Sequence, residues 1–301
     1  MSSPESVLSI HSLHKNYGKI CAVDSLSLEI KKGSVFGLLG PNGSGKSTTL
    51  GMVMDVVVPS SGSFTWFGET PNHQQRKRIG AILEKPNFYP KFSATKNLQL
   101  ACKIKEVGEE RIAQVLEQVG LSARAGYSFH TFSLGMKQRL AIASALLAQP
   151  EVLILDEPTN GLDPQGIAEI RQLIIDIAQS GKTIILASHL LDEVQKVCTE
   201  IAVLRQGKLI YTGKVNEGFG DEVMLEIASD DITALIQVMK VHPTYLSHRL
   251  HKGHIEVKCA KGAKSSELSK YLASHNIFPS HMAEHKKNLE QQFMEILSQN
   301  A

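Results

Sequence analysis

The chain has 301 residues, of which 42% are hydrophobic and 21% are charged. These values are ordinary for a folded protein, and the length allows one large domain or one domain followed by a smaller one. The formal net charge of +2 gives no support for the concentrated basic face of a general nucleic-acid-binding protein. No nucleic-acid partner is therefore expected.

Composition and patterning also argue against membrane-spanning and secreted classes. No apolar run approaches the roughly 18 to 20 residues that a spanning helix needs, and the start MSSPESVLSI lacks the pattern of a signal peptide. The scattered cysteines predict reduced thiols in a cytoplasmic compartment, with no assigned role. They are Cys21, Cys102, Cys198 and Cys259. Any contact with a membrane is expected to go through a partner.

The first 217 residues predict an α/β domain with a mostly parallel sheet. Two alternating runs in the first 30 residues predict paired strands, and a buried strand at 34–40 and a helix at 46–57 follow them. Further strands are predicted at 79–83, 152–156, 183–188 and 200–204, and helices at 94–105, 110–119, 137–148, 164–179 and 190–197. Residues 86–149 show helical patterns without a convincing strand, which indicates a helical insertion.

Glycines become less frequent after the stretch GKLIYTG at 207–213. This change in composition predicts a separate small α+β domain over residues 218–301. Residues 218–222 are typical of a linker. Beyond them the pattern predicts a strand at 223–228, a helix at 232–240, a hairpin turn at 252–253, and helices at 265–274 and 288–297. His248, His251 and His254 flank the turn, but no carboxylate or thiol stands at ligand spacing. Solvated histidines are therefore favoured over a metal site, and the role of this domain stays open.

Residues 40–47, with the sequence GPNGSGKS, match the phosphate-binding pattern G-x-x-x-x-G-K-[S/T]. They follow a buried strand and open a helix, so backbone N–H groups and the helix N-terminus can converge on phosphate. We expect Lys46 to reach the β- and γ-phosphates and Ser47 to supply an oxygen to Mg²⁺. The predicted nucleoside triphosphate site comprises Gly40, Pro41, Asn42, Gly43, Ser44, Gly45, Lys46, Ser47 and Thr48.

Two adjacent carboxylates end the buried strand at 152–156. Successive side chains of a strand point in opposite directions, so we expect Asp156 and Glu157 to have different roles in the site. Asp156 suits the Mg²⁺ shell, through water or Ser47, and Glu157 suits a base for the attacking water. His189 follows the next buried strand. Strand ends on one edge of a parallel sheet share a crevice, so His189 can face the same γ-phosphate, although a histidine at a strand end is also commonly structural.

Six elements in order, NYGK, GPNGSGKST, FSLGMKQRL, VLILDEP, NGLD and SH, resemble the nucleotide-binding subunit of an ATP-binding cassette (ABC) transporter over about residues 5–215. The resemblance implies a P-loop NTPase of ABC type, with an antiparallel β subdomain and the helical insertion. It implies that ATP is the nucleotide, that Tyr17 stacks on adenine, and that Asp163 lies between two subunits. Ser133 and Gly135 would hold the γ-phosphate bound by the other subunit, so that a head-to-tail dimer encloses two ATP molecules.

Two positions depart from the family's usual pattern. The usual Leu-Ser-Gly-Gly-Gln is FSLGM at 132–136 here, which keeps the serine and the second glycine. The family's glutamine that contacts Mg²⁺ and the membrane partner is replaced by Glu84. A carboxylate can still bind a hard cation, but it adds negative charge beside the triphosphate.

Bacterial subunits that serve bacitracin- or lantibiotic-type export, drug efflux, sodium export or gliding motility are similar in four stretches, IGAILEKPNFYP, SLGMKQRL, HLLDEVQKV and NLEQQFMEIL. This resemblance implies an ATPase on the inner face of the cell membrane that powers a separately encoded permease, which selects the cargo. The alternative is a soluble ABC ATPase of translation or DNA maintenance, although such proteins usually carry two cassettes or a long coiled-coil insertion. A P-loop kinase or GTPase would leave FSLGMKQ and NGLD unexplained.

Overall fold

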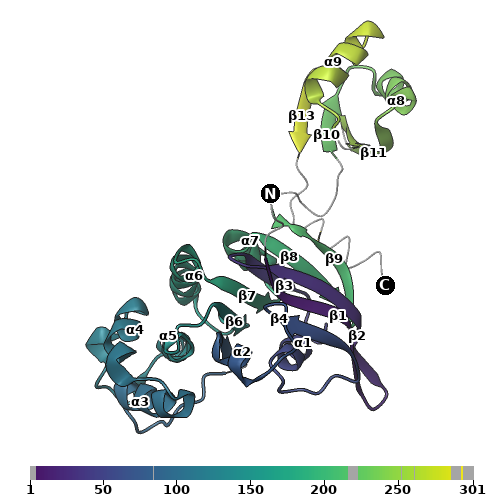
Figure 1. The fold of residues 1–301 in the computed structure, drawn as a ribbon. Coiled ribbons are helices and arrows are strands. Elements are labelled where there is room, and N and C mark those ends of the chain that lie inside the picture. The colour runs from purple at the N-terminus through teal and green to yellow at the C-terminus, as the bar shows by residue number, and fades with distance from the viewer. Residues whose placement is uncertain are drawn as a thin grey trace. The chain divides into compact units, whose positions relative to one another are not determined.

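The computed structural model describes residues 5–83, 85–215, 223–251, 253–260, 262–285 and 293. The chain divides into two units, Met1–Asn216 and Glu217–Ala301 (Figure 1). Glu84, the predicted linker at 218–222 and most of the predicted helix at 288–297 lie outside the described residues.

A six-stranded sheet forms the centre of the first unit, in the spatial order β5-β6-β7-β3-β8-β9. Its strands are β3 (Val35–Leu39), β5 (Ile79–Ile82), β6 (Val152–Asp156), β7 (Thr183–Ser188), β8 (Glu200–Arg205) and β9 (Lys208–Lys214). Every residue of β3, β6 and β7 is buried, as expected for strands that are covered on both faces. All neighbouring pairs are parallel except β8 with β9, so the carboxyl ends of β3, β6 and β7 meet at one edge.

A second, antiparallel sheet contains β1 (Ser6–Tyr17), β2 (Ile20–Lys31) and β4 (Ser61–Trp66). Its apolar side chains share one buried core with those of β3, β6 and helix α1 (Lys46–Val53). Trp66 is fully buried in this core, and its indole N–H donates to the Val53 carbonyl oxygen at 2.8 Å. The core therefore ties the antiparallel sheet to the helix that follows the phosphate-binding loop.

The other helices of the first unit are α2 (His73–Lys77), α3 (Ala94–Lys105), α4 (Ile112–Gln118), α5 (Leu134–Leu146), α6 (Pro164–Gln179) and α7 (Leu191–Val197). Short 3-10 turns occur at Glu109–Arg111, Ser122–Arg124 and Phe129–Thr131. Helices α3, α4 and α5 all fall between β5 and β6 in the chain, and α3 and α4 lie away from the antiparallel sheet (Figure 1). The predicted helical insertion is therefore confirmed.

Several element boundaries differ from the sequence predictions. The strands β4 and β9 and the five-residue helix α2 were not predicted, since each is short and carries many polar residues. Helix α1 ends at Val53 instead of Val57, because Asp55 adopts a left-handed φ of 62° that a right-handed helix cannot continue. Helix α5 begins at Leu134, three residues early, because the Ser133 side chain caps it by accepting the Met136 N–H.

The second unit has the order β10 (Val223–Ala228), α8 (Ile232–Val241), β11 (Tyr245–His251), β12 (His254–Cys259), α9 (Ser265–Ser274) and β13 (His281–His285). Its strands pair antiparallel in the spatial order β11-β12-β10-β13, the β-α-β-β-α-β arrangement of ferredoxin-like domains. Alternate residues of β10 and β12 join a core with both helices, including Leu225, Leu235, Val257 and Leu272. The predicted α+β fold is confirmed, with β13 as an additional strand.

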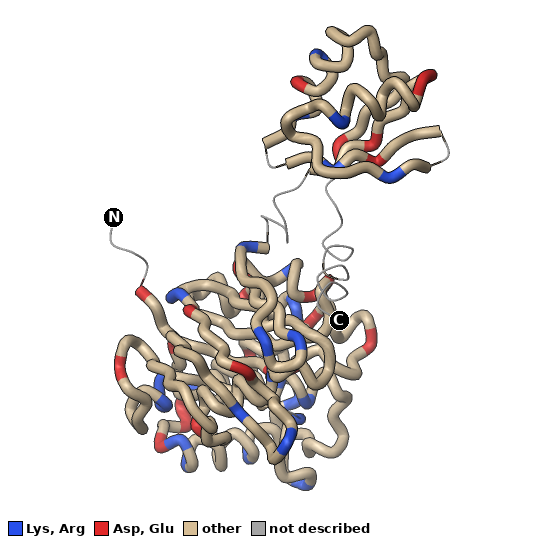
Figure 2. Tube along the Cα trace, turned by 90° about the vertical axis from the view of Figure 1, so that its right-hand side faces the viewer, with Lys and Arg blue, Asp and Glu red and all other residues tan. Residues whose placement is uncertain are grey.

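Lys and Arg are interspersed with Asp and Glu along the trace of both units (Figure 2). Among the described residues, no helix is long and apolar enough to cross a membrane.

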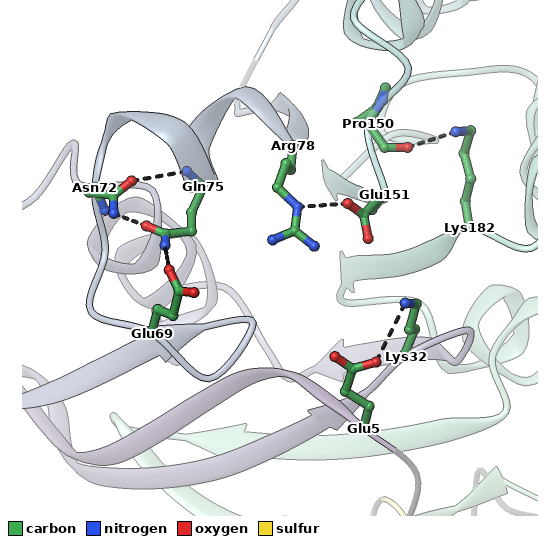
Figure 3. A network of polar contacts seen from close by, with 9 residues as sticks. All are labelled: Glu5, Lys32, Glu69, Asn72, Gln75, Arg78, Pro150, Glu151 and Lys182. Carbon is green, nitrogen blue, oxygen red and sulfur yellow. Dashed lines mark hydrogen bonds and ion pairs between the residues drawn. The ribbon is translucent and has the colours of Figure 1, made fainter.

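A polar network lies where β5, β6 and β7 begin, at the end of the sheet opposite the phosphate-binding loop (Figure 3). Arg78 Nε donates to Glu151 Oε1 at 2.6 Å, and the guanidinium lies 3.5 Å from the centroid of the Phe67 ring. The hydrogen bond from Arg78 lowers the pKa of Glu151 below its ordinary value. Lys182 Nζ donates to the Pro150 carbonyl oxygen at 2.6 Å, and burial lowers the pKa of Lys182.

Replacing Glu151 by Gln is expected to lower the free energy of unfolding by about 0.5 to 1 kcal/mol at neutral pH, because a partly exposed ion pair contributes little more. The folded pKa of Glu151 is depressed, so this stabilisation is present above the unfolded pKa of about 4.3 and disappears as pH falls through the lower folded value. Urea unfolding followed by the fluorescence of Trp66, the single tryptophan, measures the loss.

Glu117→Gln serves as the control, because it removes an exposed carboxylate on α4. It is expected to change the free energy of unfolding by less than about 0.5 kcal/mol. A loss for Glu151→Gln that persists unchanged at about pH 3 would contradict the assignment, since the carboxyl group is then largely protonated in the unfolded chain.

Candidate active site

The phosphate-binding loop at residues 40–47 connects the end of β3 to α1. Gly43 and Gly45 adopt left-handed φ angles of 78° and 103°, which glycine populates readily. A Cβ on Gly45 would lie 2.5 Å from the Ala22 carbonyl oxygen, and one on Gly40 would lie 2.3 Å from the Leu204 carbonyl oxygen. Gly40 and Gly45 therefore allow the loop to approach the neighbouring backbone more closely than other residues would.

The loop buries two polar side chains, Ser44 and Lys46. Lys46 Nζ donates to the carbonyl oxygen of Gly40 at 2.8 Å and to that of Pro41 at 3.3 Å. Ser44 Oγ has no hydrogen-bond partner within the described residues. The exposed or half-exposed members of the predicted site are Pro41, Asn42, Gly43, Ser47 and Thr48.

Lys46, Glu157 and His189 meet at the carboxyl edge of the central sheet. Glu157 Oε1 lies 3.3 Å from Lys46 Nζ, and Glu157 Oε2 lies 2.8 Å from His189 Nδ1. Asp156, the last residue of β6, is buried directly before Glu157. The Glu157 carboxylate thus links the lysine of the phosphate-binding loop to the histidine that follows β7.

The backbone at Glu157 leaves the sheet abruptly. Its φ of 48° is left-handed, a conformation that costs a non-glycine residue about 1 kcal/mol or more. Its N–H donates to the Ala187 carbonyl oxygen at 3.0 Å, so pairing with β7 holds the strained residue in place. Glu157 therefore does not continue the regular strand geometry of β6, which ends at Asp156.

Tyr17 lies at the end of β1, beside a hairpin turn in which Gly18 has a φ of 58°. Its side chain is 49% exposed, and Lys15 Nζ lies 5.0 Å from the ring centroid. An exposed aromatic ring of this kind offers a stacking surface to a planar base.

Ser133, Gly135 and Asp163 form a separate group that lines a cavity of about 670 Å³. Ser133 caps α5, and Asp163 caps α6 by accepting the Gly166 N–H at 2.8 Å. Lys46, Glu157 and His189 do not line this cavity. The predicted site residues therefore fall into two groups within one copy of the chain, and Glu84 lies outside the described residues.

The sequence patterns did not indicate Arg139 and Glu169, which pair between α5 and α6 and line the same cavity. Glu169 lies 30 residues after Arg139, so no local spacing could reveal the pair. The ion pair connects the two helices that Ser133 and Asp163 cap.

The histidines of the second unit have individual partners. His248 Nδ1 lies 2.7 Å from the Tyr245 hydroxyl. His251 Nε2 lies 3.2 Å from a Glu256 oxygen, and the rings of His251 and His254 stack with centroids 5.2 Å apart. Within the described residues, these histidines do not belong to a group of three or more side chains close enough to share a metal ion.

The chain is similar to a known protein family and to individual members of it. The family model described as ABC transporter matches residues 23–160. The bacitracin transport ATP-binding protein BcrA of Bacillus licheniformis is 34% identical over 303 residues, which cover 97% of this chain and 97% of BcrA. The match therefore extends through the second unit.

Two solved structures are similar to a large part of the chain. The structure of cbiO1 from Clostridium perfringens, part of the ABC transporter complex cbiONQ, has a TM-score of 0.65 and 31% identity, covering 71% of this chain and 90% of cbiO1. The ATP-binding cassette MJ0796, in a dimeric post-hydrolysis state bound to ADP and Pi, has a TM-score of 0.61 and 26% identity, covering 69% of this chain and 98% of MJ0796.

Replacing Gly45 by Ala is expected to lower the free energy of unfolding by about 2 to 4 kcal/mol, because the methyl group collides with the Ala22 carbonyl in addition to straining the left-handed backbone. Gly43→Ala is the matched control, since its φ is also left-handed but nothing lies within 4 Å of the added Cβ. That variant should lose about 1 kcal/mol. Urea unfolding followed by Trp66 fluorescence compares the two, and equal losses would show that the close approach to Ala22 is unimportant.

Proposed function

Because the chain belongs to the ABC transporter family as an ATP-binding subunit that hydrolyses ATP, we propose that it powers a separately encoded membrane permease in the direction of export. The observation that carries this proposal is the division of the site into two groups, Lys46–Glu157–His189 and Ser133–Gly135–Asp163. Two copies of such a chain can complete two ATP sites and move as they close and open.

The comparisons support a role in transport. BcrA, which is similar along nearly the whole chain, is named for bacitracin transport, and cbiO1 is part of a transporter complex. The Nod factor export ATP-binding protein I of Ralstonia nicotianae, which is 37% identical over 243 residues, favours export. We infer that the chain works at the inner face of the membrane, where a permease would select the cargo.

The loop at residues 40–47 suits a triphosphate. Gly40 and Gly45, which pack closely against neighbouring backbone, allow backbone N–H groups of the loop to converge on a phosphate. The buried Ser44 Oγ can donate to a phosphate oxygen. On nucleotide binding, Lys46 would exchange the loop carbonyl oxygens and Glu157 for β- and γ-phosphate oxygens. Tyr17 would stack on the adenine.

The donor groups near the loop also fit Mg²⁺. The exposed hydroxyl of Ser47 and the carboxylate of Asp156 are hard oxygen ligands of the kind this cation prefers, and Glu84 is proposed as a further ligand from its position in the sequence. When bound, Mg²⁺ would neutralise charge on the β- and γ-phosphate oxygens.

Glu157 is the proposed general base. After Lys46 turns to phosphate, Glu157 Oε1 loses its ion pair and can accept a proton from the attacking water. Glu157 Oε2 keeps its contact with His189 Nδ1, which orients the carboxylate and holds the imidazole toward the γ-phosphate. The base would therefore become available only when a triphosphate occupies the loop.

The second group of residues is proposed to act on the ATP of a second copy. Ser133 and Gly135 lie at the N-terminus of α5, where unpaired N–H groups and the helix dipole attract an anion. The cavity beside them gives access to these groups. The dimeric state of MJ0796 with ADP and Pi supports a two-copy arrangement.

Glu157→Gln is expected to retain ATP binding and to lower hydrolysis by at least about 100-fold, because the amide keeps the shape of the side chain but cannot take a proton. ATP-dependent dimers should then accumulate in size-exclusion chromatography with light scattering. Glu29→Gln, which changes an exposed carboxylate on β2, should leave turnover unchanged. Normal turnover by Glu157→Gln would rule out this residue as the base.

Ser133→Arg is expected to leave ATP binding to the monomer within about twofold while abolishing ATP-driven dimer formation and turnover, since the bulky cation blocks the acceptor site for the other copy's phosphate. Calorimetry with the monomer and light scattering with ATP separate the two effects. Ser122→Arg, in an exposed turn of the same insertion, is the control. Loss of nucleotide binding by Ser133→Arg would instead place both groups in one intramolecular site.

Purification of the tagged Glu157→Gln variant with ATP from solubilised membranes tests the transport role. A permease should co-purify with it, and the same preparation from Ser133→Arg should contain less permease, because the closed dimer does not form. Co-purification with ribosomes or DNA in place of a membrane protein would favour a soluble ABC ATPase and overturn the proposal.

A further inference from the structure

We propose that His14, Cys21 and Asp24 form a Zn²⁺ site on the antiparallel sheet of the first unit. One ligand atom from each residue lies within 4.8 Å of the other two. In the described part of the chain, this is the only group of three or more histidine, cysteine, aspartate or glutamate side chains gathered so closely. The three residues supply one nitrogen, one sulfur and one oxygen.

Irregular pairing between β1 and β2 brings these residues together. Cys21 and Asp24 are three positions apart, so in a regular strand their side chains would point to opposite faces. The register passes from Leu13↔Leu26 to Lys15↔Val23 and then to Asn16↔Cys21, so β2 contains one extra residue in each interval. Such bulges redirect side chains, and the left-handed φ of 53° at Ser25 marks one of them.

The spacing of the ligand atoms fits tetrahedral zinc. With metal–ligand distances of about 2.0 to 2.3 Å, tetrahedral geometry places ligand atoms about 3.3 to 3.8 Å apart. His14 Nδ1 already lies 3.5 Å from Asp24 Oδ1. The pairs that include Cys21 Sγ need to close by no more than about 1.3 Å, which side-chain rotation can supply.

The solvent access of the three side chains and the chemistry of their ligand atoms also favour Zn²⁺. Cys21 is exposed, and the side chains of His14 and Asp24 are 24% and 35% exposed, so a metal ion can enter from solvent and keep a water ligand. Thiolate and imidazole together prefer Zn²⁺ to Mg²⁺ or Ca²⁺. Lys208 Nζ lies 3.6 Å from Asp24 Oδ2, while Asp24 Oδ1 lies 3.5 Å from His14 Nδ1 and accepts the Ser25 hydroxyl at 3.2 Å.

The other three cysteines are poor competitors for the metal. Cys102, Cys198 and Cys259 are buried, and burial raises the pKa of each thiol. A thiolate–metal signal from the intact chain therefore reports on Cys21. A bound ion would connect β1 to β2 near the hairpin turn that follows Tyr17, and it should stabilise that hairpin.

Titration of the reduced full-length chain with Co²⁺ tests the site. The wild type should develop a thiolate-to-cobalt charge-transfer band with one equivalent, and Zn²⁺ should displace it. Cys21→Ser should abolish the band, and His14→Ala and Asp24→Asn should each weaken binding by about tenfold or more. His11→Ala, an exposed histidine on β1, is the matched control and should bind normally.

Each result decides the proposal. Absence of the band in the wild type, or its persistence in Cys21→Ser, would overturn the site. Unchanged affinity in both His14→Ala and Asp24→Asn would also overturn it, because binding would then need only the thiol. Trp66 fluorescence verifies that every variant is folded, and Zn²⁺ should raise the unfolding temperature of the wild type but not that of Cys21→Ser.

Discussion

The pairing of β3, β6 and β7 is the constraint on which the candidate active site depends. Asp156 pairs with Ala187, and Leu39 pairs with Ser188. The residues that follow these strands therefore leave the sheet at one edge, and the contacts among Lys46, Glu157 and His189 result from that alignment. A change of register would separate these side chains and would also move apolar residues out of the shared core.

Much of the fold follows from local sequence, but some elements depend on distant partners. The strands β3, β6 and β7 can be predicted from the sequence because nearly every residue in them is apolar, as burial on both faces requires. Strand β4, with the sequence SGSFTW, lacks such a signal and is fixed by its antiparallel pairing with β1. The end of α1 depends on the backbone conformation of Asp55, which its helical pattern does not reveal.

The sequence motifs identify candidate residues more reliably than they identify contacts. The phosphate-binding pattern and the strand ends predict Lys46, Glu157 and His189, yet no local spacing predicts that one carboxylate contacts both other side chains. Cys21 and Asp24 show the same limit. Their spacing in a strand argues against a shared face, and only the bulges in β2 bring them toward His14.

The two groups of site residues differ in the hydrogen-bonding partners that they have within one copy of the chain. A buried ammonium requires acceptors, and Lys46 finds them in two loop carbonyl oxygens and Glu157. Under the proposed function, a triphosphate would replace these acceptors and release the carboxylate to act as a base. At α5, the Ser133 cap occupies the Met136 N–H, while the first N–H groups of a helix have no intrahelical acceptor. We propose that those groups bind an anion that another copy brings to the cavity, so that the same fold would serve nucleotide binding in one copy and closure against the next.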